Sequence, residues 1–394
     1  LGAQGVAGLG RYFISWLETS ASSRLVEDAL APRWDEIDLR LRTQATATTV
    51  SIAALAHDGL TLHVRGRADA GTLARGIERR LREACRARSA LIVYAPHGMT
   101  MPFAEPTLVE TVRAAGGVTD VVLLPLHAGE LGDQARVRAL LRQAIDNSQA
   151  EVVALAGMLP SLTGLAAETL ASRDVTLTTG HAVTVVAMLK TVERILEATG
   201  RTWAGARVGV LGFGAIGQAT LQICVSRLGR PAQVTIADPR FGTNVSALAD
   251  CDLILGAASV GHVLDVDRLA PGTLVVDDSF PRCFEDARAW RRMERARDVL
   301  LVGGGMLDAG PLERVSPFPQ AETLRAQFPS RWLPGCHAEA LLLTLRPDLG
   351  PTTGAVDLRR ALQILAAVDA LGWHPAPLHL GVREVPNAWM PTLP

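Results

Sequence analysis

The chain has 394 residues, of which 48% are hydrophobic, and its formal net charge is −1. This length allows two domains, and the balanced charge gives no electrostatic basis for binding nucleic acid or an acidic membrane surface. No apolar run reaches the roughly 18 residues of a membrane helix, and no signal peptide is visible. The five cysteines are widely spaced and odd in number, which matches neither a disulfide framework nor a zinc site. Together these properties predict a cytoplasmic enzyme without a metal.

The first 90 residues mix helical and strand patterns. Residues 12–30 have helical spacing, and residues 48–55 and 61–65 alternate like two strands joined at Asp58-Gly59, a hairpin signal. Residues 71–88 predict an arginine-rich amphipathic helix, whose basic side is most simply a solvated face. A role in nucleic-acid binding is therefore not expected for this helix.

From residue 91 onward, short apolar strands alternate with helical patterns. Strands are expected at 91–94, 121–125 and 152–156, with helices at 105–115 and 133–146. This rhythm predicts an α/β fold with a parallel sheet. His97 and His127 fall in loops beyond the strands, where a ligand usually binds, although a loop histidine is more often incidental than catalytic.

A glycine-rich turn at residues 212–217 is the strongest motif. Residues 208–211 have the pattern of a buried strand, and residues 219–228 that of a helix. The glycines between them form G-x-G-x-x-G, in which the backbone approaches a pyrophosphate at a helix N-terminus. We predict a dinucleotide site in which these residues contact the cofactor: Gly212, Phe213, Gly214, Ala215, Ile216 and Gly217.

The strand that follows bears on the choice of cofactor. It is expected at Gln233–Ala237 and precedes Asp238, where an acid binds the ribose hydroxyls of NAD. The same carboxylate would repel the 2′-phosphate of NADPH, whereas Arg240 could pair with that phosphate. We weigh the carboxylate as stronger and predict that NADH is preferred. Only residues 239–252 precede the next strand, so the adenine side of the domain is expected to be abbreviated.

Further strands of this domain are expected at Leu253–Gly256, 273–276 and 299–302. The small residues Ala258, Ser259 and Gly304 follow two of them. Small residues at such strand ends let the ribose of the nicotinamide approach closely, and they could equally be plain turns.

A long helix, His181–Thr199, is expected to bridge two lobes. We predict a substrate-binding α/β domain over residues 1–177 and a Rossmann-type domain over 178–330. The remaining segment, 331–394, is predicted to be helical and to pack back between the lobes.

Cys336 is the leading candidate for a nucleophile. A Pro-Gly pair precedes it and a strong helical run follows, so it lies at a helix N-terminus, where the dipole favours thiolate over thiol. The alternative is a small buried residue in a helix cap. His337 could assist as an acid or base. Glu339, in the first helical turn, is a further catalytic candidate whose simpler role is to cap free N–H groups.

The start of the bridging helix offers a second set of backbone donors. Thr178, Thr179, Gly180 and His181 open this helix, and their N–H groups could hold a substrate oxyanion or a group of the cofactor. The alternative is an ordinary threonine cap. On the first interpretation, His181 is catalytic and Thr179 contacts the cofactor.

Six separated stretches match one family in order. They are 154–157 (Ala-Leu-Ala-Gly), 178–180 (Thr-Thr-Gly), 212–217, 275–277 with Pro281, 303–304, and 336–342 (Cys-His-Ala-Glu-Ala-Leu-Leu). The chain resembles the long-chain acyl-[acyl-carrier-protein] reductases, which turn acyl thioesters into fatty aldehydes. The resemblance covers residues 121–345 and implies that Cys336 carries the acyl group and that the cofactor is NADPH.

Our hypothesis is a two-lobed reductase that uses NADH or NADPH, with the acyl thioester, on a carrier protein or coenzyme A, bound between the lobes. The thiolate of Cys336 would form an acyl-enzyme, which the cofactor then reduces. One alternative is a non-covalent dehydrogenase of a small hydroxy or amino acid. Another is a catalytically silent nucleotide-binding scaffold. A homo-oligomer is compatible with all three.

Overall fold

A computed structural model describes residues 49–55, 59–65, 88–95, 99, 103–114, 117–148, 150–168, 170, 174–315 and 331–392. The helices predicted at 12–30 and 71–88 lie outside these residues, as does His97. Among the described residues, no helix is long and apolar enough to cross a membrane.

The chain forms two compact units. The first contains the residues up to Val153 together with Thr169–Thr176 and Glu313–Ala321. The second contains Ala154–Glu168, Leu177–Leu312 and Glu322–Pro394. The segment that carries Cys336 therefore belongs to the same unit as the glycine-rich turn.

The first unit contains a hairpin of two antiparallel strands, β1 (Thr49–Leu55) and β2 (Gly59–Arg65), as the Asp58-Gly59 signal predicted. A six-stranded sheet has the order β14-β4-β5-β3-β6-β7. Its strands are β3 (Arg88–Ala95), β4 (Thr107–Ala114), β5 (Gly117–His127), β6 (Val152–Leu155), β7 (Thr176–Thr178) and β14 (Leu312–Val315). The predicted helix between β5 and β6 is α5 (Gln134–Asn147).

The helix predicted at 105–115 is wrong. This segment is strand β4, which pairs antiparallel with β5, so the sheet is mixed although β3 and β5 are parallel as predicted. Its β-branched residues, Thr107, Val109, Thr111 and Val112, fit a pleated strand better than a helix. Four consecutive residues, 109–112, are buried, which means that both faces of the strand are covered.

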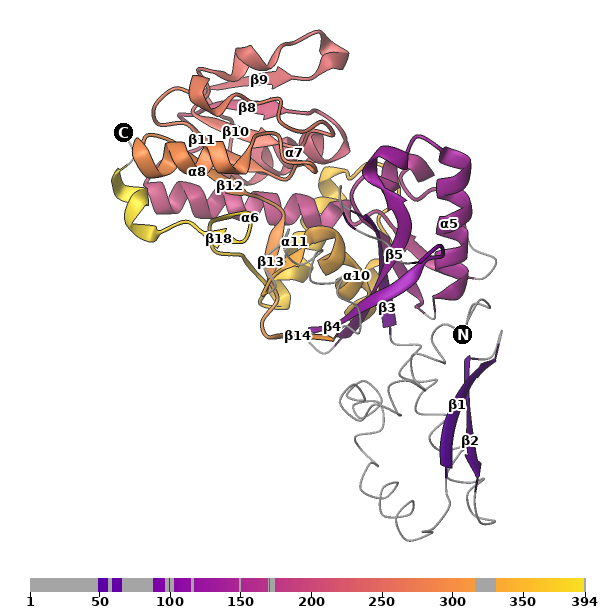
Figure 1. The fold of residues 1–394 in the computed structure, drawn as a ribbon. Helices are drawn as coiled ribbons and strands as arrows, with labels where there is room; N and C mark the ends of the chain where they lie inside the picture. The colour runs from indigo at the N-terminus through magenta and orange to yellow at the C-terminus, as the bar shows by residue number, and fades with distance from the viewer. Residues whose placement is uncertain are drawn as a thin grey trace. The chain divides into compact units, whose positions relative to one another are not determined.

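The second unit is built on a five-stranded parallel sheet with the order β12-β11-β10-β8-β9 (Figure 1). Its strands are β8 (Arg207–Leu211), β9 (Gln233–Ala237), β10 (Leu253–Gly256), β11 (Leu274–Asp277) and β12 (Leu300–Gly303). The order reverses between β8 and β10, the point where Rossmann-type sheets bind their ligand. Because β9 is the edge strand, the third strand of the usual first half is missing from this sheet, which confirms the abbreviated adenine side.

In the described part of this unit there are five α-helices: α6 (His181–Thr199), α7 (Ala215–Leu228), α8 (Asp286–Arg295), α10 (Gly335–Leu345) and α11 (Leu358–Ala370). Helix α6 contacts α7, α10 and α11 as well as β11. It is therefore buried around most of its circumference, which explains its almost continuous apolar sequence from Ala182 to Leu189.

Two small sheets complete the unit. Strands β13 (Met306–Asp308), β15 (Leu333–Pro334) and β16 (His374–Pro375) pair antiparallel around β13. Strands β17 (His379–Leu380) and β18 (Arg383–Glu384) form a short hairpin. Because β15 ends at Pro334 and α10 begins at Gly335, the three-stranded sheet fixes the position at which α10 starts.

Candidate active site

The glycine-rich turn has the backbone geometry of a phosphate-binding loop. Gly212 has a φ of +84°, and a Cβ there would lie 2.6 Å from the carbonyl oxygen of Ala257, so only glycine fits. A Cβ at Gly217 would lie 2.1 Å from the carbonyl oxygen of Gly212. At Gly214, by contrast, a Cβ would meet nothing within 4 Å. Two of the glycines are thus needed for packing, and the third faces open space at the N-terminus of α7.

The open space at Gly214 shows whether a dinucleotide could bind at this turn. Gly214 is the N-cap of α7 in extended backbone with no side-chain cap, so the first N–H groups of this helix are available to an anion. Phe213, Ala215 and Ile216 are half-buried around it. The turn therefore fits the pyrophosphate of a dinucleotide.

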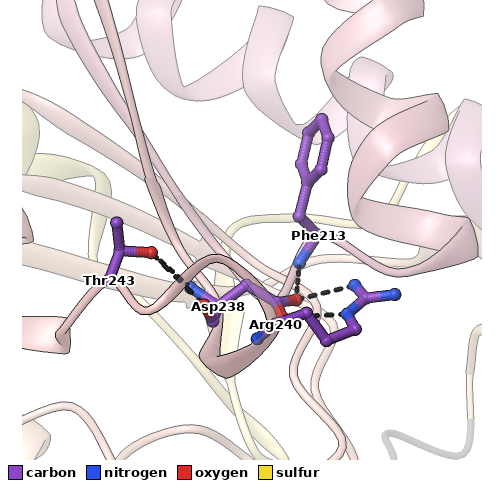
Figure 2. A network of polar contacts seen from close by, with 4 residues as sticks. All are labelled: Phe213, Asp238, Arg240 and Thr243. Atoms are coloured by element: carbon purple, nitrogen blue, oxygen red, sulfur yellow. Dashed lines mark hydrogen bonds and ion pairs between the residues drawn. The ribbon is translucent and has the colours of Figure 1, made fainter.

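The side chains of Asp238 and Arg240 form an ion pair (Figure 2). The Oδ2 atom of Asp238 accepts from the Phe213 N–H at 2.7 Å and from Nη2 of Arg240 at 2.7 Å. Its Oδ1 atom accepts from Nε and from the backbone N–H of Arg240, both at 2.9 Å. The side chain of Asp238 is 7% exposed and that of Arg240 is 62% exposed.

The carboxylate is fully engaged by these contacts. Four donors match the roughly four lone-pair sites of a carboxylate, and the hydrogen bonds of Arg240 hold the pKa of Asp238 well below its usual range. Ribose hydroxyls could bind Asp238 only by displacing Arg240, whose guanidinium is the exposed partner. Asp238 and Arg240, whose effects on the cofactor the sequence analysis weighed against each other, are thus paired in this structure.

The other predicted cofactor residues differ in their surroundings. Ala258 is half-buried and its N–H donates to Ser279 Oγ at 2.8 Å, whereas Ser259 is exposed. Gly304 is buried, and a Cβ there would lie 2.0 Å from the sulfur of Met188. Thr179 is buried, and its Oγ1 accepts from the His181 N–H at 3.2 Å. Although Gly180 is the N-cap residue of α6, this contact favours the capping role that the sequence left open as an alternative for Thr179.

Cys336 lies where the N-termini of α6 and α10 meet. A Cβ at Gly180 would lie 2.5 Å from both Cα and Cβ of Cys336. A Cβ at Gly335 would lie 2.4 Å from Cα of Thr184. The two helices therefore touch backbone to backbone through a pair of glycines, and this contact brings the predicted turn 178–181 to the predicted nucleophile.

Glu339 ties the two helices together. It is fully buried, and its carboxylate accepts from Thr178 Oγ1 at 2.5 Å and from the Val183 N–H at 2.9 Å. Its capping role is therefore real, but it caps α6 rather than its own helix. Since both carboxylate oxygens are engaged by these donors, the structure favours the capping role of Glu339 over the catalytic one.

The two predicted histidines are both buried. Burial lowers the pKa of His181 to about 4, so its imidazole is neutral at pH 7. Nδ1 of His181 has no hydrogen-bond partner among the residues that the structure describes. His337 follows Cys336 in the first turn of α10. His127 belongs to the first unit, where its N–H donates to Glu130 at 2.7 Å in a local turn.

The thiol of Cys336 does not have the lowered pKa expected for a helix N-terminus. Burial raises this pKa to about 12, and the negative charges of Asp278 and Glu339 add to the increase. Desolvation of the thiolate thus outweighs the helix dipole in this structure. Cys336 remains half-buried, whereas Cys224, Cys251 and Cys283 are buried.

Asp278 is a site residue that the sequence analysis missed. It follows the last residue of β11, and a Cβ at Gly305 would lie 1.8 Å from its Oδ1. Burial and the charge of Asp277 raise the pKa of Asp278 to about 8, which Arg282 partly opposes. The available signal was a pair of consecutive acids at the carboxyl end of a nucleotide-domain strand.

Comparisons with known proteins give partial likenesses. No family model matches the chain. The aminotransferase PigE of Serratia sp. (strain ATCC 39006) is 32% identical over 95 residues, which are 24% of this chain and 10% of that protein. The chain thus matches about a tenth of the length of this relative.

Solved structures of dehydrogenases resemble the chain more broadly. One is the NAD+-bound 3-phosphoglycerate dehydrogenase of Entamoeba histolytica, with 13% identity over 57% of this chain and 80% of that one, at a TM-score of 0.30. Another is the NAD-dependent malic enzyme of Thermotoga maritima, with 11% identity over 59% and 70%, at a TM-score of 0.36. Because these scores are low, the assignment of the fold rests on the strand order and the glycine turn described above.

Proposed function

We propose that the chain is a nicotinamide-dependent oxidoreductase that reduces an acyl thioester to an aldehyde, with the acyl group carried on Cys336. The contact between Gly180 and Cys336 supports this most directly. It sets a half-buried thiol beside the start of a second helix, in the unit that also contains the glycine-rich turn. A nucleophile beside hydrogen-bond donors is the arrangement that acyl transfer requires.

Residues of the turn would hold the cofactor. The N–H groups at the start of α7 would bind the pyrophosphate, and the open face of Gly214 would admit it. When bound, the nicotinamide supplies the hydride that reduces the acyl group.

His181 is the proposed donor to the oxyanion on the acyl carbon. The N–H groups of His181 and Val183 are already used by Thr179 and Glu339. The imidazole of His181 is neutral at pH 7, since its pKa is about 4, and a neutral imidazole donates one N–H. The imidazole is proposed in addition to the backbone donors that the sequence suggested.

The pairing of Asp238 with Arg240 favours NADPH over NADH, in contrast to the preference that we inferred from the sequence. The carboxylate already accepts four hydrogen bonds, whereas the guanidinium is exposed and retains N–H groups that can bind the 2′-phosphate. Asp238 would hold Arg240 in place rather than repel the phosphate.

Matched glycine variants test the cofactor site. Gly214→Ala should fold like the natural chain, because a Cβ there meets nothing within 4 Å, but it should weaken NADPH binding by blocking the pyrophosphate. Gly132→Ala is the control, since a Cβ there also meets nothing within 4 Å, its φ is not positive, and it lies in the first unit. Both affinities are measured by nicotinamide fluorescence. Equal affinity in Gly214→Ala and the natural chain would contradict this cofactor site.

Intact mass tests the acyl-enzyme. The protein is incubated with an acyl thioester of coenzyme A or of a carrier protein, without cofactor. We expect one acyl group to be added to the natural chain and none to Cys336→Ser. Turnover of cofactor without any adduct would instead support the non-covalent dehydrogenase.

A further inference from the structure

The raised pKa of the Cys336 thiol leaves a chemical problem. A thiol whose pKa is about 12 is almost entirely protonated at pH 7, and only the thiolate attacks a thioester efficiently. An attack by Cys336 therefore requires a group that accepts its proton. This inference rests on the proposed function.

Asp278 is linked to the residue before Cys336 through Gly305. Its Oδ1 lies against Cα of Gly305, where a Cβ would be only 1.8 Å away. The carbonyl of Gly305 accepts from the Gly335 N–H at 2.8 Å, and Cys336 is the next residue. The adjacent pairing of Met306 with Pro334 keeps this register. The carboxyl of Asp278 thus contacts Gly305, and Gly305 is hydrogen-bonded to the residue that precedes Cys336.

The acidic groups next to Asp278 and Cys336 already have hydrogen-bond donors. The groups that act on Cys336 are Asp278 and Glu339, and those that act on Asp278 are Asp277 and Arg282. Glu339 is engaged by Thr178 and Val183. Asp277 is held by the N–H groups of Ser279 and Cys283, both at 3.2 Å. Among the described residues, none donates a hydrogen bond to the carboxyl of Asp278, and both Asp278 and Cys336 are half-buried.

We propose that Asp278 is the proton acceptor and donor for Cys336 during acylation. The Asp278 carboxylate takes the proton of the Cys336 thiol while Sγ forms a bond to the carbonyl carbon of the thioester. The bond between that carbon and the sulfur of the carrier then breaks, and the departing thiolate takes the proton from Asp278. The products are acyl-Cys336, a carrier thiol and the original carboxylate, with no oxidation or reduction.

The electrostatic properties agree with this role. A carboxyl with a pKa of about 8 is close to neutrality in basicity and exchanges a proton with solvent near physiological pH. An ordinary carboxylate, with a pKa near 4, would be a weaker base toward a thiol. Because the two groups interact, their protons come off as a coupled pair.

Asp278→Asn gives opposite predictions for two rates at Cys336. The amide removes a negative charge, so the pKa of the thiol falls and its alkylation by iodoacetamide at pH 8 becomes faster. The amide cannot accept the proton, so acylation by an acyl-pantetheine thioester without cofactor becomes slower, by about 10²-fold or more. Both rates are read by mass spectrometry of the peptide that contains Cys336.

The pH profile and a matched variant separate this role from a structural one. In the natural chain the acylation rate should rise with pH through the ionisation of Asp278 near pH 8, and Asp278→Asn should lack this step. Asp286→Asn, which removes a carboxylate on the other side of Arg282, should keep it. Unchanged NADPH binding shows that each variant is folded.

Three results would overturn the inference. Faster acylation in Asp278→Asn would show that the carboxylate only raises the pKa of the thiol. An unchanged acylation rate would show that Asp278 takes no part in the step. Both leave the acyl-enzyme itself intact. Absence of acyl-Cys336 in the natural chain would overturn the proposed function and the role of Asp278 together.

Discussion

At the scale of single residues, the structure shows which acidic side chains are held by hydrogen-bond donors. The sequence analysis gave Asp238 as a cofactor contact and Glu339 as a catalytic candidate whose simpler role is capping. In the structure Asp238 accepts four hydrogen bonds from Arg240 and Phe213, and Glu339 accepts one on each oxygen, from Thr178 and Val183. Asp278, which the sequence did not single out, has a raised pKa beside the thiol. A sequence can show that an acidic residue follows a strand. It cannot show how many hydrogen-bond donors surround that residue, because some of the donors come from distant parts of the chain.

Arg240→Ala tests the proposed cofactor choice. Removing the guanidinium frees two acceptor sites of Asp238 and removes the partner of the 2′-phosphate. Because a charge-assisted contact with the phosphate is lost, NADPH affinity should fall by about 10-fold. NADH affinity should hold or rise. Fluorescence titrations with both cofactors measure this, and equal losses for both would contradict the assignment of Arg240 to the phosphate.

Asp278 also predicts how stability depends on pH. Because folding raises the pKa of this carboxyl from the ordinary value near 4 to about 8, the folded chain holds a proton there between these values. Its contribution to stability is complete below pH 4 and is lost as pH rises to 8. Asp278→Asn removes this loss. Urea unfolding should show a variant that gains stability relative to the natural chain between pH 5 and pH 8.5, and a constant difference would refute the raised pKa.

At the scale of elements, most of the second unit could be predicted. The bounds of α6, β9 and β10 agree with the sequence because each is a distinct apolar run between glycines or polar residues. The strand β4 could not be predicted as such, because its apolar spacing also suits a helix and its pairing with β5 is a tertiary contact. The junction of α6 and α10 is likewise invisible in sequence, since its two glycines are 155 positions apart.

This junction predicts a large effect for a small substitution. Gly180→Ala would put a methyl group 2.5 Å from the backbone of Cys336, so α6 and α10 must separate. Gly200→Ala, at the other end of α6, has a similar positive φ of +65° but no neighbour within 4 Å. Both variants carry the backbone cost of about 1–2 kcal/mol for a non-glycine residue in this region. Urea unfolding should show a clearly larger loss for Gly180→Ala, together with altered alkylation of Cys336. Equal losses would mean that the helices do not touch there.

At the scale of the whole molecule, the second unit contains all three segments that the proposed reaction uses. The glycine-rich turn, the start of α6 and the segment of Cys336 come from separate stretches of the chain and share one compact unit. The domain boundaries drawn from sequence, the cytoplasmic location, the homo-oligomer and the carrier of the acyl group stay predictions. Sequence could suggest the turn and the cysteine separately, because each has a local pattern. That both belong to one compact unit depends on the packing of α6 against its neighbours, which no local pattern shows.

A single-turnover experiment tests the central claim most directly. The acyl-enzyme is formed without cofactor, freed of excess thioester and then mixed with NADPH. The account predicts that about one equivalent of aldehyde forms for each acyl group, that the same amount of NADPH is consumed, and that the protein returns to its unmodified mass. Release of the acyl group as a carboxylic acid at the same rate with and without NADPH would contradict it.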